Sequence, residues 1–96
     1  MKFTQAGWDA VNGTSLQGYI PATYQQLVER FGQPEGDAGD KTTVEWLLQF
    51  EDGTVATIYD WKEYSTPVGM YHWHIGGKSN LAVARVQQAF KQKATV

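Results

Sequence analysis

The chain has 96 residues, of which 42% are hydrophobic and 19% charged, and this composition indicates one folded domain over residues 1–96 and excludes a disordered protein. Its net charge of −2 argues against general nucleic-acid binding, because contacts to phosphates require an excess of basic residues. The absence of cysteine excludes disulfides, a thiolate nucleophile and zinc–thiolate sites.

Residues 1–20 contain no long apolar run. They therefore predict neither a signal peptide nor a membrane span, and we expect a protein of the cytoplasm that makes no membrane contact. Asn12-Gly13 favours a turn with positive φ. We expect a short strand or an irregular arm on each side of this turn.

Residues 21–31 carry the spacing of an amphipathic helix, with apolar side chains at i, i+3, i+4 and i+7: Tyr24, Leu27, Val28 and Phe31. Pro21 suits the first helical turn. Thr23 and Gln26 have the spacing of a capping box, which gives an alternative start two residues later. Gly32 is suited to a left-handed conformation that ends the helix.

Residues 35–40 form a polar loop with three carboxylates. A cation site is one interpretation, but the alternating ligands and closing glutamate of a calcium loop are missing. We therefore favour a solvated loop and predict no bound metal.

Residues 43–50 and 54–61 read as a hairpin joined through Asp52-Gly53. Alternation puts Val44, Trp46, Leu48 and Phe50 on one face of the first strand. A third strand at residues 70–75 places Tyr71, Trp73 and Ile75 on one face and His72 and His74 on the other. A closing helix spans about 79–92, with Ser79 or Asn80 as its N-cap. We predict an α+β fold: an antiparallel β-sheet of three to five strands with two helices packed on one face. Exposed edge strands make a homodimer an expectation as well.

The turn Gly76-Gly77-Lys78-Ser79 lies between a strand and a helix N-terminus, where free backbone N–H groups favour an anion. It is not a nucleotide-binding P-loop, because His72 stands where that motif needs glycine. The alternative is a plain turn with a helix cap.

His72 and His74 share a strand face, a spacing that can hold zinc when a third ligand such as Asp60 or Glu45 lies beside them. Hydrogen bonding to a ligand or to polar neighbours is the favoured interpretation.

The run Tyr59-Asp60-Trp61-Lys62 also has two interpretations. In the functional one, Asp60 and Lys62 converge with Glu45, His72 and His74 on one polar face that Tyr64 rims. In the alternative, Tyr59 and Trp61 pack under a helix, and Asp60 and Lys62 form a solvated pair. Nucleophilic catalysis finds no support, because no Gly-x-Ser-x-Gly elbow is present. General acid–base chemistry by His74 and Asp60 remains a third, trailing hypothesis.

Three sequence motifs resemble those of a known protein family. They are Tyr-x-x-Leu-Val-x-x-Phe-Gly-x-Pro at 24–34, Asp-Gly-Thr-Val-Ala-Thr-Ile-Tyr-Asp-Trp-Lys at 52–62 and Trp-His-Ile-Gly-Gly at 73–77. Together with Asp40-Lys41 and Glu45-Trp46, they resemble a family of small hypothetical proteins of tailed bacteriophages. The resemblance spans about residues 15–90 and implies an accessory protein of the infected host cytoplasm, by analogy a counter-defence factor.

Two functions follow as hypotheses. The first is a protein that sequesters a phosphate-bearing, nucleotide-derived ligand without a cofactor. Its ligand-binding residues would be Asp60, Trp61, Lys62, Tyr64, His72, His74, Gly76, Gly77, Lys78 and Ser79. The second is a protein–protein inhibitor that presents aromatic side chains and its acidic loop directly to a host defence enzyme.

Overall fold

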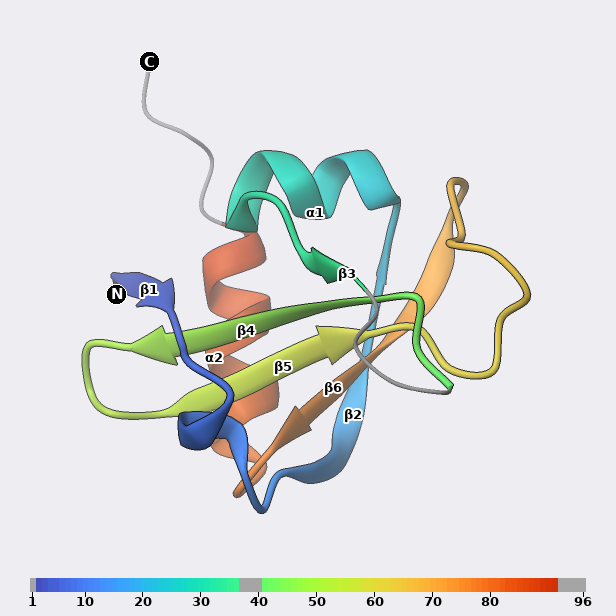
Figure 1. Ribbon diagram of the computed structural model, residues 1–96. Coiled ribbons are helices and arrows are strands. Elements are labelled where there is room, and N and C mark those ends of the chain that lie inside the picture. Colours follow the sequence, from blue (N-terminus) through green and yellow to red (C-terminus); the bar gives the residue numbers. More distant parts are fainter. Residues whose placement is uncertain (1, 37–40, 92–96) are drawn as a thin grey trace.

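The computed structural model describes residues 2–36 and 41–91, and these residues form an antiparallel sheet with two α-helices on one side (Figure 1). The predicted α+β class is confirmed. The sheet has six strands, one more than the upper expectation, in the order β1-β4-β5-β6-β2, with β3 also paired to β4. The strands are β1 (Phe3–Gln5), β2 (Ser15–Ala22), β3 (Glu35–Gly36), β4 (Val44–Phe50), β5 (Val55–Tyr59) and β6 (Tyr71–Gly77). The helices are η1, a 3₁₀ turn (Asp9–Val11), α1 (Tyr24–Phe31) and α2 (Leu81–Lys91).

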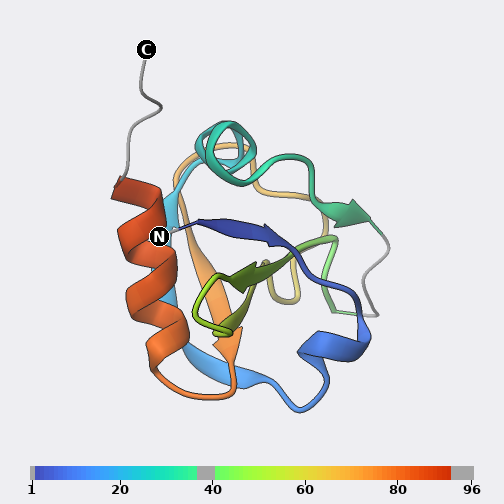
Figure 2. The ribbon, with the colours of Figure 1, turned by 90° about the vertical axis from the view of Figure 1, so that its left-hand side faces the viewer.

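One face of the sheet carries the core. The buried apolar side chains of the strands alternate as predicted, and those of α1 and α2 join the same cluster: Ile20, Ala22, Leu27, Phe31, Trp46, Leu48, Phe50, Ala56, Ile58, Trp73, Ile75, Ala82, Val86 and Ala89. Figure 2 shows α2 on this side of the sheet and η1 on the other. Both α-helices therefore cover one face, as expected.

Two buried tryptophans attach α1 to the sheet. Trp73 Nε1 donates to the carbonyl oxygen of Ala22 at 3.0 Å, just before the helix, and Trp46 Nε1 donates to that of Gly32 at 2.7 Å, just after it. The two indoles meet edge to face, with ring centroids 5.4 Å apart. A buried indole N–H needs an acceptor, so these bonds fix both ends of α1 while the rings fill the core.

The start of α1 follows the capping box rather than the proline. Thr23 Oγ1 accepts from the Gln26 N–H at 3.1 Å, and Gln26 Oε1 accepts from the Thr23 N–H at 2.9 Å. Pro21 belongs to β2 and pairs with His72, so the predicted helical start at residue 21 is wrong. Gly32 ends the helix with φ 87°, the positive value expected for it.

Strand β2 is longer than the short strand or irregular arm expected after Asn12-Gly13, and it continues through Pro21. Its eight residues include Gly18 and Pro21 and show no apolar alternation. A proline is tolerated because β2 is an edge strand, where no N–H is needed on the outer side. The register of β2 also shifts between Leu16 and Gly18. A bulge and a proline both discourage strand addition by a second chain, and the homodimer stays a prediction.

None of the helices within the described segments is long and apolar enough to cross a bilayer.

Candidate functional site: an aromatic row on the open face

The sheet face opposite α1 and α2 is covered at one end only. Leu47 and Thr57 point to this face, yet both are buried. The turn η1 contacts β5 there, and the Ala6 N–H donates to the Leu47 carbonyl oxygen at 2.9 Å. The N-terminal segment thus closes this end, whereas Tyr59 and His74 at the other end keep part of their surface exposed among the described residues.

A row of four side chains crosses the uncovered end. The register pairs Glu45 with Tyr59, Tyr59 with His74, and His74 with Tyr19, so the four residues lie side by side on β4, β5, β6 and β2. We call them the open-face row. The His74 ring centroid is 4.8 Å from that of Tyr19 and 5.4 Å from that of Tyr59. Tyr19 remains 50% exposed.

Trp61 extends the row beyond the end of β5. Its ring centroid lies 6.2 Å from that of Tyr59 and 6.3 Å from that of His74, and the residue is 41% exposed. The Lys41 ammonium lies 5.6 Å from the centre of the Trp61 ring. Because the rings pack against one another rather than around a hollow, they form a platform for a planar group, not a cage for a cation.

Burial shifts the pKa values of two groups of the row, Glu45 and His74, towards their neutral forms. Burial raises the pKa of Glu45 to about 7. Burial also lowers the pKa of His74, an effect that the Asp60 and Glu63 carboxylates oppose. His74 Nδ1 is buried and has no hydrogen-bond partner within residues 2–36 and 41–91. The platform therefore offers an uncharged imidazole beside the positive charge of Lys41.

Asp60 does not join the histidines, and this part of the predicted polar face is wrong. Register places Ile58 opposite Trp46, so the Asp60 side of β5 faces the core, whereas Glu45 and His74 face outward. The Asp60 carboxylate is fully buried and accepts from the Thr43 N–H at 2.7 Å and from Thr43 Oγ1 at 2.6 Å. Thr43 Oγ1 in turn bonds Thr66 Oγ1 at 2.7 Å. Asp60 thereby holds together the two loops that carry Lys41 and Trp61.

The alternative interpretation of the same run is also wrong. Tyr59 and Trp61 lie on the face away from the helices, and Asp60 is not a solvated partner of Lys62. Lys62 adopts φ 57°, and its N–H donates to the Lys41 carbonyl oxygen at 2.7 Å. The strand ends at Tyr59, so alternation no longer applies to Lys62.

Gly76 and Gly77 serve close packing. Neither has positive φ, which a backbone anion nest requires. A Cβ on Gly76 would lie 2.5 Å from Thr57 Oγ1, and one on Gly77 would lie 2.3 Å from Ala82 Cβ. Ser79 Oγ accepts from the Leu81 N–H at 3.3 Å, and the Ser79 carbonyl from the Ala82 N–H at 3.1 Å. These bonds occupy the N–H groups of Leu81 and Ala82 at the start of α2, and phosphate binding at Lys78 stays a prediction.

The other predicted residues are dispersed. His72 shares the outer face with His74 but is exposed, and Tyr64 is fully exposed in the loop before β6. Within residues 2–36 and 41–91, no three His, Asp or Glu side chains gather as a metal would need. The acidic stretch 37–40 lies outside the described residues. Of the predicted ligand-binding residues, Trp61 and His74 lie together in this site. Tyr19, Tyr59 and Lys41 belong to the same site but were missed, because the pairing of the strands was unknown.

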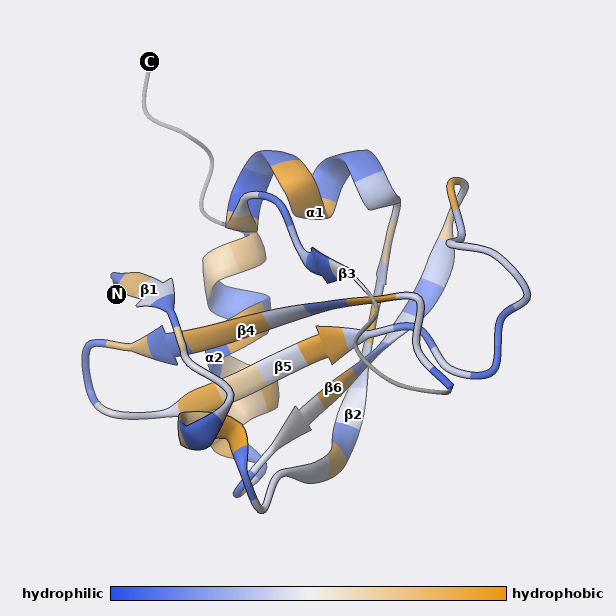
Figure 3. Cartoon of the chain, in the orientation of Figure 1, coloured by the Kyte–Doolittle hydropathy of each residue, from blue (hydrophilic) through white to orange (hydrophobic). Residues whose placement is uncertain are grey.

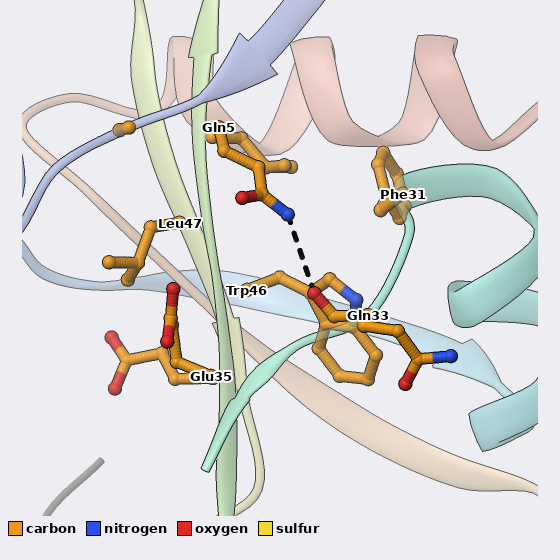
Figure 4. A pocket seen from close by; sticks show the side chains of 9 residues that line it. Gln5, Phe31, Gln33, Glu35, Trp46 and Leu47 are labelled. Carbon is orange, nitrogen blue, oxygen red and sulfur yellow. Dashed lines mark hydrogen bonds between the residues drawn. The ribbon is translucent and has the colours of Figure 1, made fainter.

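A small hollow lies beside Glu45, where β1, β3 and β4 meet (Figure 4). Across it, Gln5 Nε2 donates to the Gln33 carbonyl oxygen at 3.5 Å. Its volume of about 10 Å³ holds no more than one water molecule. Ligand binding in this region therefore depends on the surface of the row.

The chain matches no family model, and neither a curated protein nor a solved structure is significantly similar to it. The resemblance to bacteriophage proteins accordingly stays a prediction.

Proposed function

We propose that this protein binds and sequesters a planar, phosphate-bearing ligand of the nucleotide class on the open-face row and Trp61. The observation that carries the proposal is the contiguous set of four partly exposed rings on the sheet face away from the helices, with a lysine ammonium over the outermost ring.

Each part of the platform has a counterpart in such a ligand. A base that stacks on Trp61 gains about 1–3 kcal/mol. The Lys41 ammonium lies close enough to the same ring to pair with a phosphate attached to the base. The imidazole of His74 and the hydroxyls of Tyr19 and Tyr59 provide hydrogen-bonding groups at the edge of the rings.

The biological role follows by analogy from the resemblance described above. A phage accessory protein that sequesters a nucleotide-derived signal in the host cytoplasm would counter a bacterial immune response. Removal of the ligand by stoichiometric binding requires no catalytic group, so we propose no enzymatic step.

Thermal melting with a panel of mononucleotides, dinucleotides and cyclic nucleotides tests the proposal. A ligand at a hundredfold excess over its Kd stabilises the fold by about 2.7 kcal/mol, which raises Tm by roughly 10 °C or more. Trp61→Ala should abolish the shift. Trp8→Ala is the matched control, because Trp8 is similarly exposed at 49% but precedes η1, away from the row. Absence of a shift with every nucleotide would contradict the proposal.

A second candidate is a protein–protein inhibitor, and the loop between β5 and β6 favours it. Tyr64, Val68 and Met70 are all strongly exposed. The hydrophobic colour at the outer end of this loop is visible in Figure 3. The Thr43–Thr66 and Tyr71–Glu63 hydrogen bonds hold the base of the loop in place. Exposed aromatic and apolar side chains on a fixed loop are typical of binding hot spots.

Pull-down from bacterial lysate at low salt tests this candidate. We expect one stoichiometric host protein with the native chain and none with a Tyr64→Ser, Met70→Ser double variant. Equal recovery with both chains would show that the loop is not the contact.

A further inference from the structure

Glu45 occupies an unusual place in the sheet. On β4 it pairs with Tyr59 on one side and with Glu35 of β3 on the other. Like charges directly opposite each other on neighbouring strands destabilise a sheet. The register therefore places an acidic side chain, not a basic one, opposite Glu45 on β3.

Among the described residues that pair with Glu45 or line the adjacent hollow, none carries a positive charge. The facing groups are the Glu35 carboxyl from β3 and the Tyr59 ring from β5, and the uncharged Gln5 and Gln33 line the adjacent hollow. In the part of the chain that the structure describes, Glu45 makes neither a side-chain hydrogen bond nor an ion pair. Burial raises its pKa to about 7. A large fraction of Glu45 is thus protonated at neutral pH, and its O–H finds no partner among residues 2–36 and 41–91.

The register places Glu45 directly beside the platform. Side chains directly opposite on neighbouring strands have Cβ atoms about 5 Å apart. A planar group that covers the Tyr59 ring therefore has Glu45 on one side, His74 on the other and Trp61 beside it.

We propose that Glu45 determines the specificity of the site: its protonated carboxyl donates a hydrogen bond to an acceptor atom on the edge of the bound ring. This inference rests on the proposed function. The hydrogen bond from Glu45 selects heterocycles that present a ring nitrogen or carbonyl oxygen at that edge. Ligand binding is also coupled to the protonation of Glu45, whose proton comes from solvent.

The first arm of the test needs no ligand. A ¹³C NMR titration of the Glu45 carboxyl in the full chain, assigned with Glu45→Gln, should give a midpoint near pH 7. A midpoint below about pH 5.5, in the ordinary carboxyl range, would overturn the inference.

The second arm measures binding of cyclic AMP from about pH 5.5 to about pH 8.5. Cyclic AMP is chosen because its phosphodiester does not titrate in this range, whereas a terminal phosphate titrates near pH 6. The signal is the change in tryptophan fluorescence in a Trp8→Phe background, where Trp61 is exposed and the remaining tryptophans, Trp46 and Trp73, are buried in the core. Above the Glu45 midpoint, we expect affinity to fall by about tenfold per pH unit. Glu45→Gln keeps a donor and should bind without this pH dependence. Glu45→Ala should bind about 3- to 10-fold more weakly than native at low pH.

The outcomes separate the two proposals. Binding that shows the same pH dependence in Glu45→Gln, or none in the native chain, overturns the role of Glu45 and leaves ligand binding intact. No fluorescence change at any pH counts against nucleotide binding itself, even where Glu45 titrates near pH 7. Melting curves of each variant verify that it is folded.

Discussion

Gly77→Ala tests whether the paired glycines serve packing or anion binding. The new Cβ would lie 2.3 Å from Ala82 Cβ, 3.3 Å from the Ser79 carbonyl oxygen and 3.4 Å from that of Val55. Carbon atoms in contact are about 3.5–4.0 Å apart, so α2 must move by about 1 Å or more. Two backbone atoms block movement of the Cβ itself. We therefore expect the upper end of the usual cost of overpacking, about 3 kcal/mol, which lowers Tm by roughly 12–24 °C.

A double-mutant cycle gives the decisive comparison. Ala82→Gly removes the clashing atom, although glycine within a helix costs about 1 kcal/mol. The double variant should melt higher than Gly77→Ala alone, with a coupling of about 2 kcal/mol. Gly69→Ala is the control, because its Cβ meets nothing within 4 Å, and we expect a change within about 0.5 kcal/mol. An unchanged Tm in Gly77→Ala, or no rescue by Ala82→Gly, would refute the packing argument and restore the anion nest.

Three further variants test other parts of the structure. Asp60→Ala leaves the Thr43 N–H and hydroxyl without their buried acceptor, and we expect a loss of about 2–4 kcal/mol in urea denaturation; a loss below about 0.5 kcal/mol would contradict the assigned role. Folding raises the pKa of Glu45 from 4.5 to about 7, so its contribution to stability is fully present below pH 4.5 and is lost as the pH rises towards 7. As the pH rises from 4.5 to about 7, the Tm of Glu45→Gln should therefore increase relative to the Tm of the native chain. A difference between the two Tm values that stays constant over this range would argue against a buried carboxyl. Thr23→Ala removes the capping box and should lower the free energy of unfolding, measured by thermal melting, by about 1 kcal/mol. An increase in stability would contradict the observed start of α1.

The strongest predictions from sequence concerned local structure. Alternation assigned Trp46, Leu48, Trp73 and Ile75 to the core because a strand turns its side chains with a period of two. The Asp52-Gly53 turn and the Gly32 cap were predicted for a similar reason, since both depend on the positive φ that glycine adopts freely, 90° and 87° here. These signals involve residues close together in the chain.

The candidate site could be predicted only in part. Trp61 and His74 were recognised from residue type, but Tyr19 entered the site from β2, a strand with no apolar pattern. Asp60 was assigned to the wrong face because the register between the hairpin strands was unknown, and only that register opposes Ile58 to Trp46.

Sequence by itself therefore determined the fold class, the core-facing side chains of β4 and β6 and the C-terminal end of α1. Tertiary structure alone decided which outward side chains meet, that Asp60 binds Thr43 across seventeen residues, and that Gly77 makes room for Ala82. The physical reason is that the period of a strand or helix is a property of consecutive residues, whereas contacts between strands depend on how distant segments pair when the core closes.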